Sequence, residues 1–390
     1  MKYAVLGNLC KMQSGGTPRR GNNHYYGGKI PWVKIGDIDK SNGKPITQTT
    51  ETITKEGLES ISNRLFSKGT LLLAMYGSVG KTAFAGTELS TNQAILGINI
   101  KDESLLDYSY LKHWFDYNRL KILKGARGAT LQNISATIVK GFKIPLPPLP
   151  EQKRIAQILD KADTLRQKNK QLLATYDELL KATFLDMFGD PANNQKGLPL
   201  GTIRDLVDTV NYGTSSKAED NGEFPYLRMN NITYEGAMDF SDLKYINLSE
   251  KEKPKYIIKK GDLLFNRTNS KELVGKTAVY REKQEMVIAG YIIRVRANDK
   301  ANTDYISAYL NSKHGKAVLR GLCKSIVGMA NINAQELQKI KILIPPISIQ
   351  NQFAQIVENI EAQKAILKQS IQQCENLFNA LVQKAFKSEL

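Results

Sequence analysis

This chain of 390 residues has few of the residues from which metal and disulfide sites are built. It contains three cysteines (Cys10, Cys323 and Cys374) and three histidines, all far apart in the sequence. An odd number of scattered cysteines argues against a disulfide framework and favours a reducing, cytoplasmic compartment. Neither residue type shows the close spacing of metal ligands, so the sequence predicts no metal site.

Long hydrophobic runs are also absent. The longest, such as Leu71–Tyr76, are much shorter than the roughly 20 residues that a membrane-spanning helix needs. The first ten residues, MKYAVLGNLC, lack the basic-then-apolar order of a signal peptide. We therefore expect no contact with a membrane. Hydrophobic residues still make up 41 %, which is enough for packed cores in two or three domains.

Acidic residues are too few to balance the basic ones, and the net charge is +17. Residues 1–147 hold 20 Lys/Arg against 10 Asp/Glu, and residues 191–345 hold 24 against 17. Residues 148–190 (7 against 7) and 346–390 (4 against 4) are neutral. A polyanion such as double-stranded DNA should therefore contact the two basic blocks and not the neutral segments. The alternative is a generally basic soluble protein.

The chain repeats itself at an offset of 198 residues, from position 143 to position 341. Lys143–Ile158 reads KIPLPPLPEQKRIAQI, and Lys341–Ile356 reads KILIPPISIQNQFAQI. The blocks before these segments share shorter matches, such as GKTA at 80–83 and again at 275–278. Repetition on this scale implies a pseudo-symmetric molecule whose partner offers two related binding places.

Within each basic block, short β-branched and alternating runs predict strands. The predicted strands cover 32–35, 70–76, 81–85 and 94–100, with counterparts at 226–229, 262–266, 276–280 and 289–296. Helices are predicted at 107–123 and 303–322. The predicted fold is α/β (mixed α+β): two pseudo-repeated, strand-rich recognition domains at 1–147 and 191–345, separated by long antiparallel coiled-coil helices at 148–190 and 346–390.

Both neutral segments have the heptad pattern of a long helix whose apolar seam faces a partner. The predicted seam of the first contains Ile155, Ile158, Leu165, Leu172 and Leu179, with Ala162, Asn169, Tyr176 and Thr183 between them; that of the second contains Phe353, Ile356, Leu367, Leu377 and Leu381. Connectivity makes the two helices antiparallel if they pack together. About 36 residues at ~1.5 Å each give a spacer of roughly 54 Å. The alternative is two unconnected surface helices.

Two motifs resemble catalytic loops but lack required residues. Gly77–Thr82 has the end of a phosphate-binding loop, but position 75 is Met75 and the second copy has Ser270 where the pattern needs glycine. The diprolines Pro147-Pro148 and Pro345-Pro346 lack the acidic or amide residue and the aromatic residue of a methyltransferase loop. We interpret the diprolines as joints between domain and helix.

Side chains suited to DNA contact occur in the loops of both blocks. Arginine reads guanine, and asparagine or glutamine reads adenine, through paired hydrogen bonds, whereas lysines more often contact phosphates. Each residue alone is better explained as a solvated loop residue or a turn asparagine, so the prediction concerns the group. The candidates are Arg19, Arg20, Lys34, Lys81, Arg127, Gln132, Asn133, Arg228, Asn230, Asn231, Arg267, Asn269, Lys276, Lys324 and Asn331.

These features together resemble the specificity subunit of type I restriction-modification systems. The resemblance covers essentially the whole chain. It is carried by the block–helix–block–helix order, by PLPPLPEQKRIAQILDKAD at 145–163, by the strand and loop Leu71–Ala83, and by GATLQNI at 128–134.

The resemblance implies two target-recognition domains, each reading one half of a split, asymmetric DNA sequence. It implies that the helices set the spacing and dock two methyltransferase subunits. Those subunits and a separate restriction or translocase subunit would bring S-adenosylmethionine, Mg²⁺ and ATP, so this chain would hold no cofactor and carry no catalysis. The alternatives are a DNA methyltransferase or nuclease with a cryptic active site, and a scaffold that binds nucleic acid without sequence preference.

Overall fold

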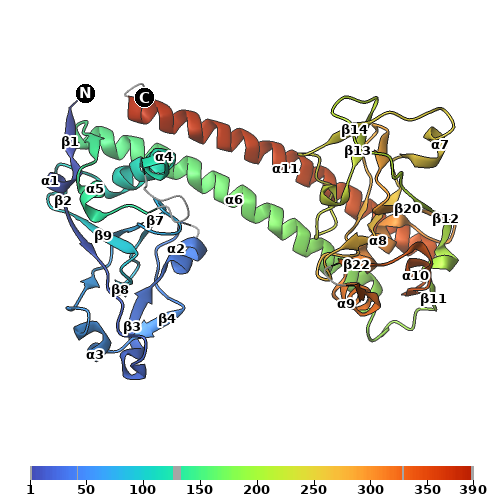
Figure 1. Cartoon of the computed structure of the whole chain (residues 1–390), viewed down its shortest axis with the longest axis horizontal. Helices are drawn as coiled ribbons and strands as arrows, with labels where there is room; N and C mark the ends of the chain where they lie inside the picture. The colour runs from blue at the N-terminus through green and yellow to red at the C-terminus, as the bar shows by residue number, and fades with distance from the viewer. Residues whose placement is uncertain (1, 42, 126–132, 327–328, 388–390) are drawn as a thin grey trace. The chain divides into compact units, whose positions relative to one another are not determined.

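The computed structural model describes residues 2–41, 43–125, 133–326 and 329–387. The chain divides into two compact units. Unit 1 comprises Met1–Lys170 and Ser370–Leu390, and unit 2 comprises Gln171–Gln369. Each unit contains several small sheets and helices, together with parts of the long helices α6 (Leu149–Phe188) and α11 (Ile347–Lys387) (Figure 1). The predicted mixed α/β fold, with strand-rich domains separated by a long helix, is confirmed.

Unit 1 has three described sheets. One four-stranded sheet has the order β2-β9-β6-β7, a second has the order β4-β3-β8-β5, and β1 pairs with β10. The strands are β1 (Tyr3–Val5), β2 (Cys10–Ser14), β3 (Tyr26–Val33), β4 (Glu51–Ile53), β5 (Leu65–Phe66), β6 (Leu71–Ala74), β7 (Thr82–Phe84), β8 (Leu89–Thr91), β9 (Ile95–Ile100) and β10 (Lys143–Pro145).

Unit 2 repeats this topology. Its four-stranded sheets have the orders β12-β20-β16-β18 and β14-β13-β19-β15, β11 pairs with β23, and β17-β22-β21 form one further sheet. The strands are β11 (Leu200–Thr202), β12 (Val207–Tyr212), β13 (Phe224–Leu227), β14 (Lys244–Ile246), β15 (Ile257–Ile258), β16 (Leu263–Asn266), β17 (Thr268–Asn269), β18 (Thr277–Val279), β19 (Met286–Ile288), β20 (Ile292–Ala297), β21 (Lys324–Ile326), β22 (Met329–Asn331) and β23 (Lys341–Leu343).

The repeat extends to the direction of the strands. Among the described strands, each unit has one parallel pair, β3 with β8 and β13 with β19, and the other named strand pairs are antiparallel. The internal repeat seen in the sequence is therefore a repeat of the fold. All eight predicted strands are found, with ends shifted by a few residues.

The shorter helices connect the sheets. They are α1 (Leu6–Leu9), η1 (Asn23–Tyr25), α2 (Ile35–Ser41), α3 (Lys55–Glu59), α4 (Tyr108–Gly125) and α5 (Ala136–Lys140) in unit 1, and η2 (Ile203–Leu206), η3 (Met229–Asn231), α7 (Lys253–Tyr256), α8 (Thr303–Asn311), α9 (Lys313–Leu322) and α10 (Ala334–Gln338) in unit 2. The single helix predicted at 303–322 is wrong. Ser312 is extended and its side chain accepts a hydrogen bond from Gly315 N at 3.0 Å, so it ends α8 and caps α9.

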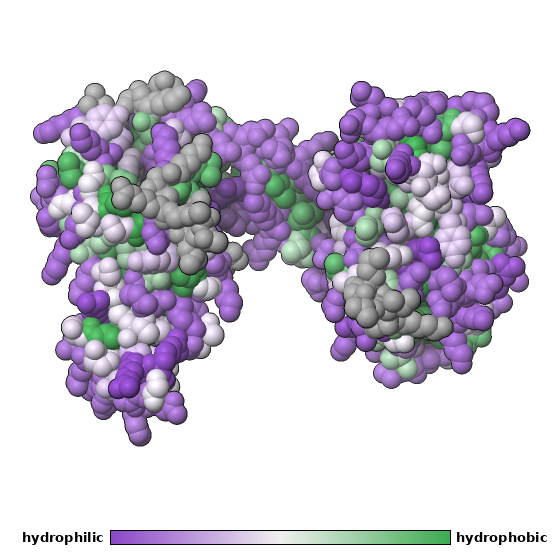
Figure 2. All heavy atoms as spheres, viewed as in Figure 1, coloured by the Kyte–Doolittle hydropathy of each residue, from purple (hydrophilic) through white to green (hydrophobic). Residues whose placement is uncertain are grey.

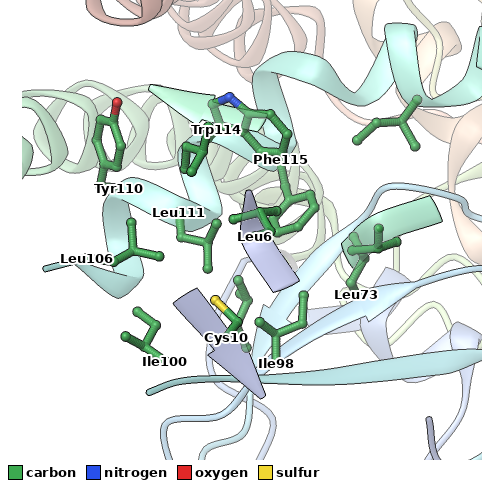
Figure 3. Close-up of a cluster of buried hydrophobic side chains, with 14 of the residues drawn as sticks. Leu6, Cys10, Leu73, Ile98, Ile100, Leu106, Tyr110, Leu111, Trp114 and Phe115 are labelled. Carbon is green, nitrogen blue, oxygen red and sulfur yellow. The ribbon is translucent and has the colours of Figure 1, made fainter. Parts of the chain in front are cut away.

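The largest core of unit 1 lies between α4 and the β2-β9-β6-β7 sheet (Figure 3). Leu6, Leu73, Ile98 and Phe115 are completely buried there, beside the sulfur of Cys10. Residues of both long helices join the same cluster: Ile155, Ala156 and Leu159 of α6, and Val382, Ala385 and Phe386 of α11. The C-terminal part of α11 is therefore a component of the core of unit 1.

A buried glutamine fixes the start of each long helix. The amide of Gln152 donates to Leu105 O at 2.9 Å and to Pro147 O at 2.8 Å, and accepts from Asp107 N at 3.0 Å. Gln350 makes the equivalent bonds to Lys300 O, Pro345 O and Asn302 N. Both side chains are fully buried. Each amide thus makes three hydrogen bonds to backbone groups. These bonds tie the helix to the strand-rich part of its unit.

Within each unit, segments of α6 and α11 pack antiparallel to each other. In unit 1 Arg166 lies 4.8 Å from the ring of Phe378, and Asn169 Nδ2 is 3.1 Å from Ser370 Oγ. In unit 2 the rings of Phe184 and Phe353 are 5.9 Å apart.

The unit 2 interface also holds a buried cation. The Nζ atom of Lys364 lies 2.7 Å from carboxylate oxygens of both Asp177 and Glu361. Burial lowers the pKa of this lysine, but the two hydrogen bonds outweigh burial and hold the pKa above its ordinary value. Lys364 therefore stays charged inside the helix interface.

The register of the helix interface differs from the predicted seam at every second position. The predicted seam residues Leu165, Leu172 and Leu179 are 50 %, 44 % and 47 % exposed, and Leu377 is 55 % exposed. The adjacent positions are buried or half-buried instead: Leu159, Arg166, Leu173 and Leu180 on α6, and Val357, Lys364 and Phe378 on α11. The predicted positions Ile155, Asn169, Phe353 and Leu367 are buried or half-buried as expected, and Ile158, Ile356 and Leu381 are half-buried.

Replacing Gln152 by alanine should destabilise unit 1. The substitution leaves two carbonyls and one N–H without their partner, and each unpaired buried group costs free energy, so we expect a loss of about 2–4 kcal/mol in the free energy of unfolding. Gln157→Ala is the matched control, because Gln157 is exposed on the same helix. Urea unfolding followed by circular dichroism measures both. Equal, small losses for the two variants would contradict the proposed attachment.

Candidate nucleic-acid interface

In unit 1, Arg20 and Lys34 share one carboxylate. Arg20 Nη1 lies 2.7 Å from Glu51 Oε2, and Lys34 Nζ pairs with Glu51 Oε1. These hydrogen bonds, that of Lys34 first and then that of Arg20, hold the pKa of Glu51 below its ordinary value. Glu51 opens β4 beside the end of β3, where Trp32 is its cross-strand neighbour. The structure thus brings together two predicted DNA-contacting residues and adds an acid that the sequence analysis missed.

Unit 2 has an ion pair at the equivalent place. Arg228 follows β13 as Lys34 follows β3, and its Nη2 lies 2.7 Å from Asp242 Oδ2. Asn230 donates to the same carboxylate oxygen at 3.1 Å. The backbone arrangement is therefore repeated, but the side chains differ: unit 1 has lysine and glutamate at this place, and unit 2 has arginine and aspartate.

Asn231 is not available to read a base. It is 1 % exposed, its amide donates to Asp239 O and Asp242 O, and its oxygen accepts from Arg228 N at 2.8 Å. In unit 1 the carboxylate of Asp37 accepts from Lys34 N in the same way. The prediction for Asn231 is wrong because its side chain forms the turn that follows β13.

A second group of candidates in unit 2 gathers at the small sheet β17-β22-β21. Strand pairing places Thr268 opposite Asn331 and Asn269 opposite Ala330. Beside them the guanidinium of Arg267 lies 4.8 Å from the ring centre of Tyr212, and Ile332 N donates to Arg267 O. Arg267, Asn269 and Asn331 therefore lie together, and Tyr212 is a stacking partner that the sequence did not indicate.

The two lysines of the repeated GKTA segment differ. Lys81 is half-buried and pairs with Asp39, which also accepts from Ser78 Oγ at 3.0 Å. Lys276 is 8 % exposed and donates to Met229 O at 2.6 Å, and burial lowers its pKa although Glu235 acts in the opposite direction. The prediction that Lys276 contacts a phosphate is wrong for this conformation, because its ammonium group is used inside the unit.

The remaining candidates are only partly described. Arg19 and Asn133 are exposed. Lys324 lies on β21, and its side chain is outside the described part. Arg127 and Gln132 lie outside the described residues.

One cavity of unit 1 lies beside α2, α4 and parts of α6 and α11, and both polar and apolar side chains line it. Its volume is about 660 Å³. Among the cations that line it, Lys81 pairs with Asp39, Lys112 pairs with Asp116 at 2.8 Å, and Arg166 pairs with Asp163. Because most of these charges are matched, the cavity does not form a strong anion site. Among the described residues, no group of three or more His, Cys, Asp or Glu side chains is arranged to hold a metal ion.

Hydrophilic residues cover most of the face drawn in Figure 2, and green patches interrupt this cover along α6. The large exposed apolar residues of this helix are Leu165 in unit 1 and Leu172, Leu179 and Leu185 in unit 2. With 3.6 residues per turn, Leu172 and Leu179 lie about 90° to one side of the contact with α11. No described helix is both long and apolar enough to cross a membrane.

Known proteins resemble this chain over nearly its full length. It is 25 % identical to the type I restriction enzyme EcoKI specificity subunit of Escherichia coli (strain K12), over 93 % of this chain and 82 % of that protein. It is 26 % identical to the type I restriction enzyme MjaIX specificity subunit of Methanocaldococcus jannaschii, over 98 % of this chain and 92 % of that protein.

A solved structure has the same fold. The S subunit of the type-I restriction-modification system of M. genitalium superposes with a TM-score of 0.62 at 15 % identity, covering 99 % of this chain and 96 % of that one. The family model described as "Type I restriction modification DNA specificity domain" matches residues 1–175 and 200–376, which is one match for each repeat. The chain therefore belongs to the type I restriction-modification DNA specificity family.

Proposed function

We propose that this chain is the DNA-recognition subunit of a type I restriction-modification complex in the cytoplasm, and that each basic block reads one half of a bipartite, asymmetric target. The observation that carries the proposal is a repeated frame with unlike polar side chains at equivalent places, Lys34 with Glu51 in one unit and Arg228 with Asp242 in the other. Two domains with the same backbone fold can contact two turns of one duplex in the same way. Their different side chains can then recognise two different half-sites.

In this proposal residues 1–147 and 191–345 are the two target-recognition domains, and residues 148–190 and 346–390 are spacers. The charge distribution supports the division, because both spacers are neutral while the domains carry +10 and +7. A positively charged domain gains affinity for DNA through release of counterions, and a neutral helix does not. The buried glutamines at 152 and 350 support rigid joints between domain and spacer.

The test of this function is selection of bound duplexes from a random pool by the full chain with its partner subunits. We expect a two-part consensus with an unspecified gap. Exchanging residues 191–345 for the corresponding block of a relative should change one half of the consensus and leave the other intact, since each block reads separately. No enrichment of any sequence would instead support a scaffold that binds DNA non-specifically.

A length change tests the role of the helices. One heptad inserted into α6, with a matching heptad in α11, adds about 10 Å to the spacer. At ~3.4 Å per base pair, the unspecified gap should lengthen by roughly three base pairs while both half-sites stay the same. The same selection experiment measures the gap. An unchanged gap in a folded variant refutes the spacer role.

We further propose that the exposed leucines of α6 dock methyltransferase subunits, two for each chain, and that a restriction or translocase subunit joins them. Exposed apolar side chains in a row are typical of a protein interface. In this assembly S-adenosylmethionine, Mg²⁺ and ATP belong to the partner subunits.

The competing hypothesis is an enzyme with a cryptic active site in this chain. It predicts saturable binding of S-adenosylmethionine by the isolated chain. Calorimetric titration without partners distinguishes the two.

Charge placed on the leucine row should weaken docking. The double substitution Leu172→Glu and Leu179→Glu puts two carboxylates where apolar contact is expected, and we expect at least a tenfold weaker association with the methyltransferase subunit. Ala174→Glu is the matched control, because Ala174 is exposed on the opposite flank of the same helix. Analytical ultracentrifugation of the mixed subunits measures association. Equal weakening by the control would contradict docking at this row.

A further inference from the structure

The pair formed by Arg20 and Glu51 lies in an open pocket at one end of unit 1. The pocket has a volume of about 430 Å³ and is lined by Arg20, Asn23, Tyr26, Thr50, Glu51 and Thr52, together with Gly27. Its lining residues lie on η1, β3 and β4 and in the loops before η1 and β4. In Figure 1, β3 and β4 lie near α3 and away from α4. Residues 17–34 contain four basic side chains and no acidic one. Glu51 is therefore a carboxylate placed against a basic segment.

A bulge in β3 shapes this pocket. The pairing with β4 shifts between Tyr26 and Ile30, so both residues face Ile53 and the chain between them loops out. Gly27 has φ +78°, and a Cβ atom at Gly28 would lie 2.4 Å from Ile53 O, so both positions require glycine. Bulges of this kind redirect neighbouring side chains and occur often beside functional sites.

Arg20 is held in place although it is exposed. Its guanidinium carbon lies 4.9 Å from the ring centre of Tyr26 and 5.0 Å from that of Trp32. Trp32 is buried and donates from Nε1 to Gly16 O at 3.0 Å, and the Tyr26 hydroxyl donates to Pro18 O at 2.6 Å. Two anchored rings thus fix the guanidinium, whose side chain is still 55 % exposed. Only Nη1 has a partner among the described residues, so the other N–H groups are free to bind a ligand.

Glu51 is held from the opposite side. Its Oε1 atom accepts from Lys34 and its Oε2 atom accepts from Arg20 at 2.7 Å, and its side chain is 32 % exposed. The low pKa of Glu51 keeps it ionised throughout the physiological range. A fixed donor group and a fixed acceptor group therefore stand side by side, and both are open to solvent.

We propose that Arg20 and Glu51 together read one G·C base pair in the half-site of the first domain. This inference rests on the proposed function. In the major groove, O6 of guanine and the N4 amino group of cytosine hydrogen-bond to each other, so they lie about 3 Å apart. That spacing matches the 2.7 Å between Arg20 and Glu51, with arginine donating to guanine and glutamate accepting from cytosine.

An A·T pair fits this arrangement less well. The free N–H groups of Arg20 match the two neighbouring acceptors of guanine, N7 and O6. On an A·T pair, Glu51 could accept from N6 of adenine, but beyond O4 the arginine would meet the thymine methyl group. In unit 2, Arg228 pairs with Asp242, but no described aromatic ring stacks on Arg228. The arrangement of Arg20 and Glu51 is therefore not repeated in unit 2.

The experiment selects duplexes with the full chain and with Arg20→Lys, Arg20→Gln, Glu51→Gln and Glu59→Gln, and measures thermal unfolding of each. Arg20→Lys keeps the charge but not the paired donors, so total affinity should stay similar while preference for G·C at one position falls about five- to 150-fold. Arg20→Gln and Glu51→Gln should lose preference at that same position only. Glu59→Gln removes an exposed carboxylate of the same unit and should leave the consensus unchanged.

The outcomes separate this inference from the function on which it rests. If all four variants retain the gapped consensus unchanged, Arg20 and Glu51 do not read a G·C base pair, and the proposed function still stands. If the Arg20 variants bind every sequence equally more weakly, Arg20 contacts a phosphate and the G·C assignment is wrong. An effect confined to an A·T position also contradicts the assignment. If the unaltered chain enriches no gapped consensus, the proposed function fails. Loss of fold cannot imitate the expected result, because unfolding lowers binding to all sequences alike.

Discussion

The attachment of each long helix to its strand-rich domain depends on one buried amide. Gln152 and Gln350 each bridge three backbone groups, one on the proline turn that precedes the helix and two on the loop that precedes α4 or α8. A helix joined only by its backbone would swivel at the diproline. Three hydrogen bonds in a buried environment remove this freedom, because breaking them leaves polar groups without water. Any spacing that the helices impose on a bound duplex requires this rigidity.

Opposite charges are arranged differently in the helices and in the domains. Inside the helix interface of unit 2, Lys364 pairs with two carboxylates of the protein itself, so its charge is neutralised there. In the domains the pairs Arg20–Glu51 and Arg228–Asp242 leave one member widely open to solvent. An exposed ion pair contributes little to stability, about 0–1 kcal/mol. Such pairs therefore add little to the stability of the fold, and in the proposed function they are side chains held ready for DNA.

The sequence predicts the repeat, the strands and the two long helices, because these depend on local patterns that recur twice. It could not choose the register of the helix interface, since Ile158-Leu159, Leu172-Leu173 and Leu179-Leu180 are apolar doublets that fit either register. The position that decides the register in α11 is Lys364, which is charged and yet buried. Likewise Asn231 looks like a base reader until its turn is seen, and Glu51 and Tyr212 acquire a role only through residues distant in the chain.

The core of unit 1 is completed by Val382, Ala385 and Phe386, which follow its other residues only after the whole of unit 2. About 200 residues separate Lys170 from Ser370. At a synthesis rate of roughly 5–20 residues per second, the ribosome needs about 10–40 s to make this stretch. During that time the first domain emerges with an uncovered apolar surface beside α4. The order of synthesis therefore delays completion of the first domain until after the second has been made, and exposes the nascent chain to aggregation in between.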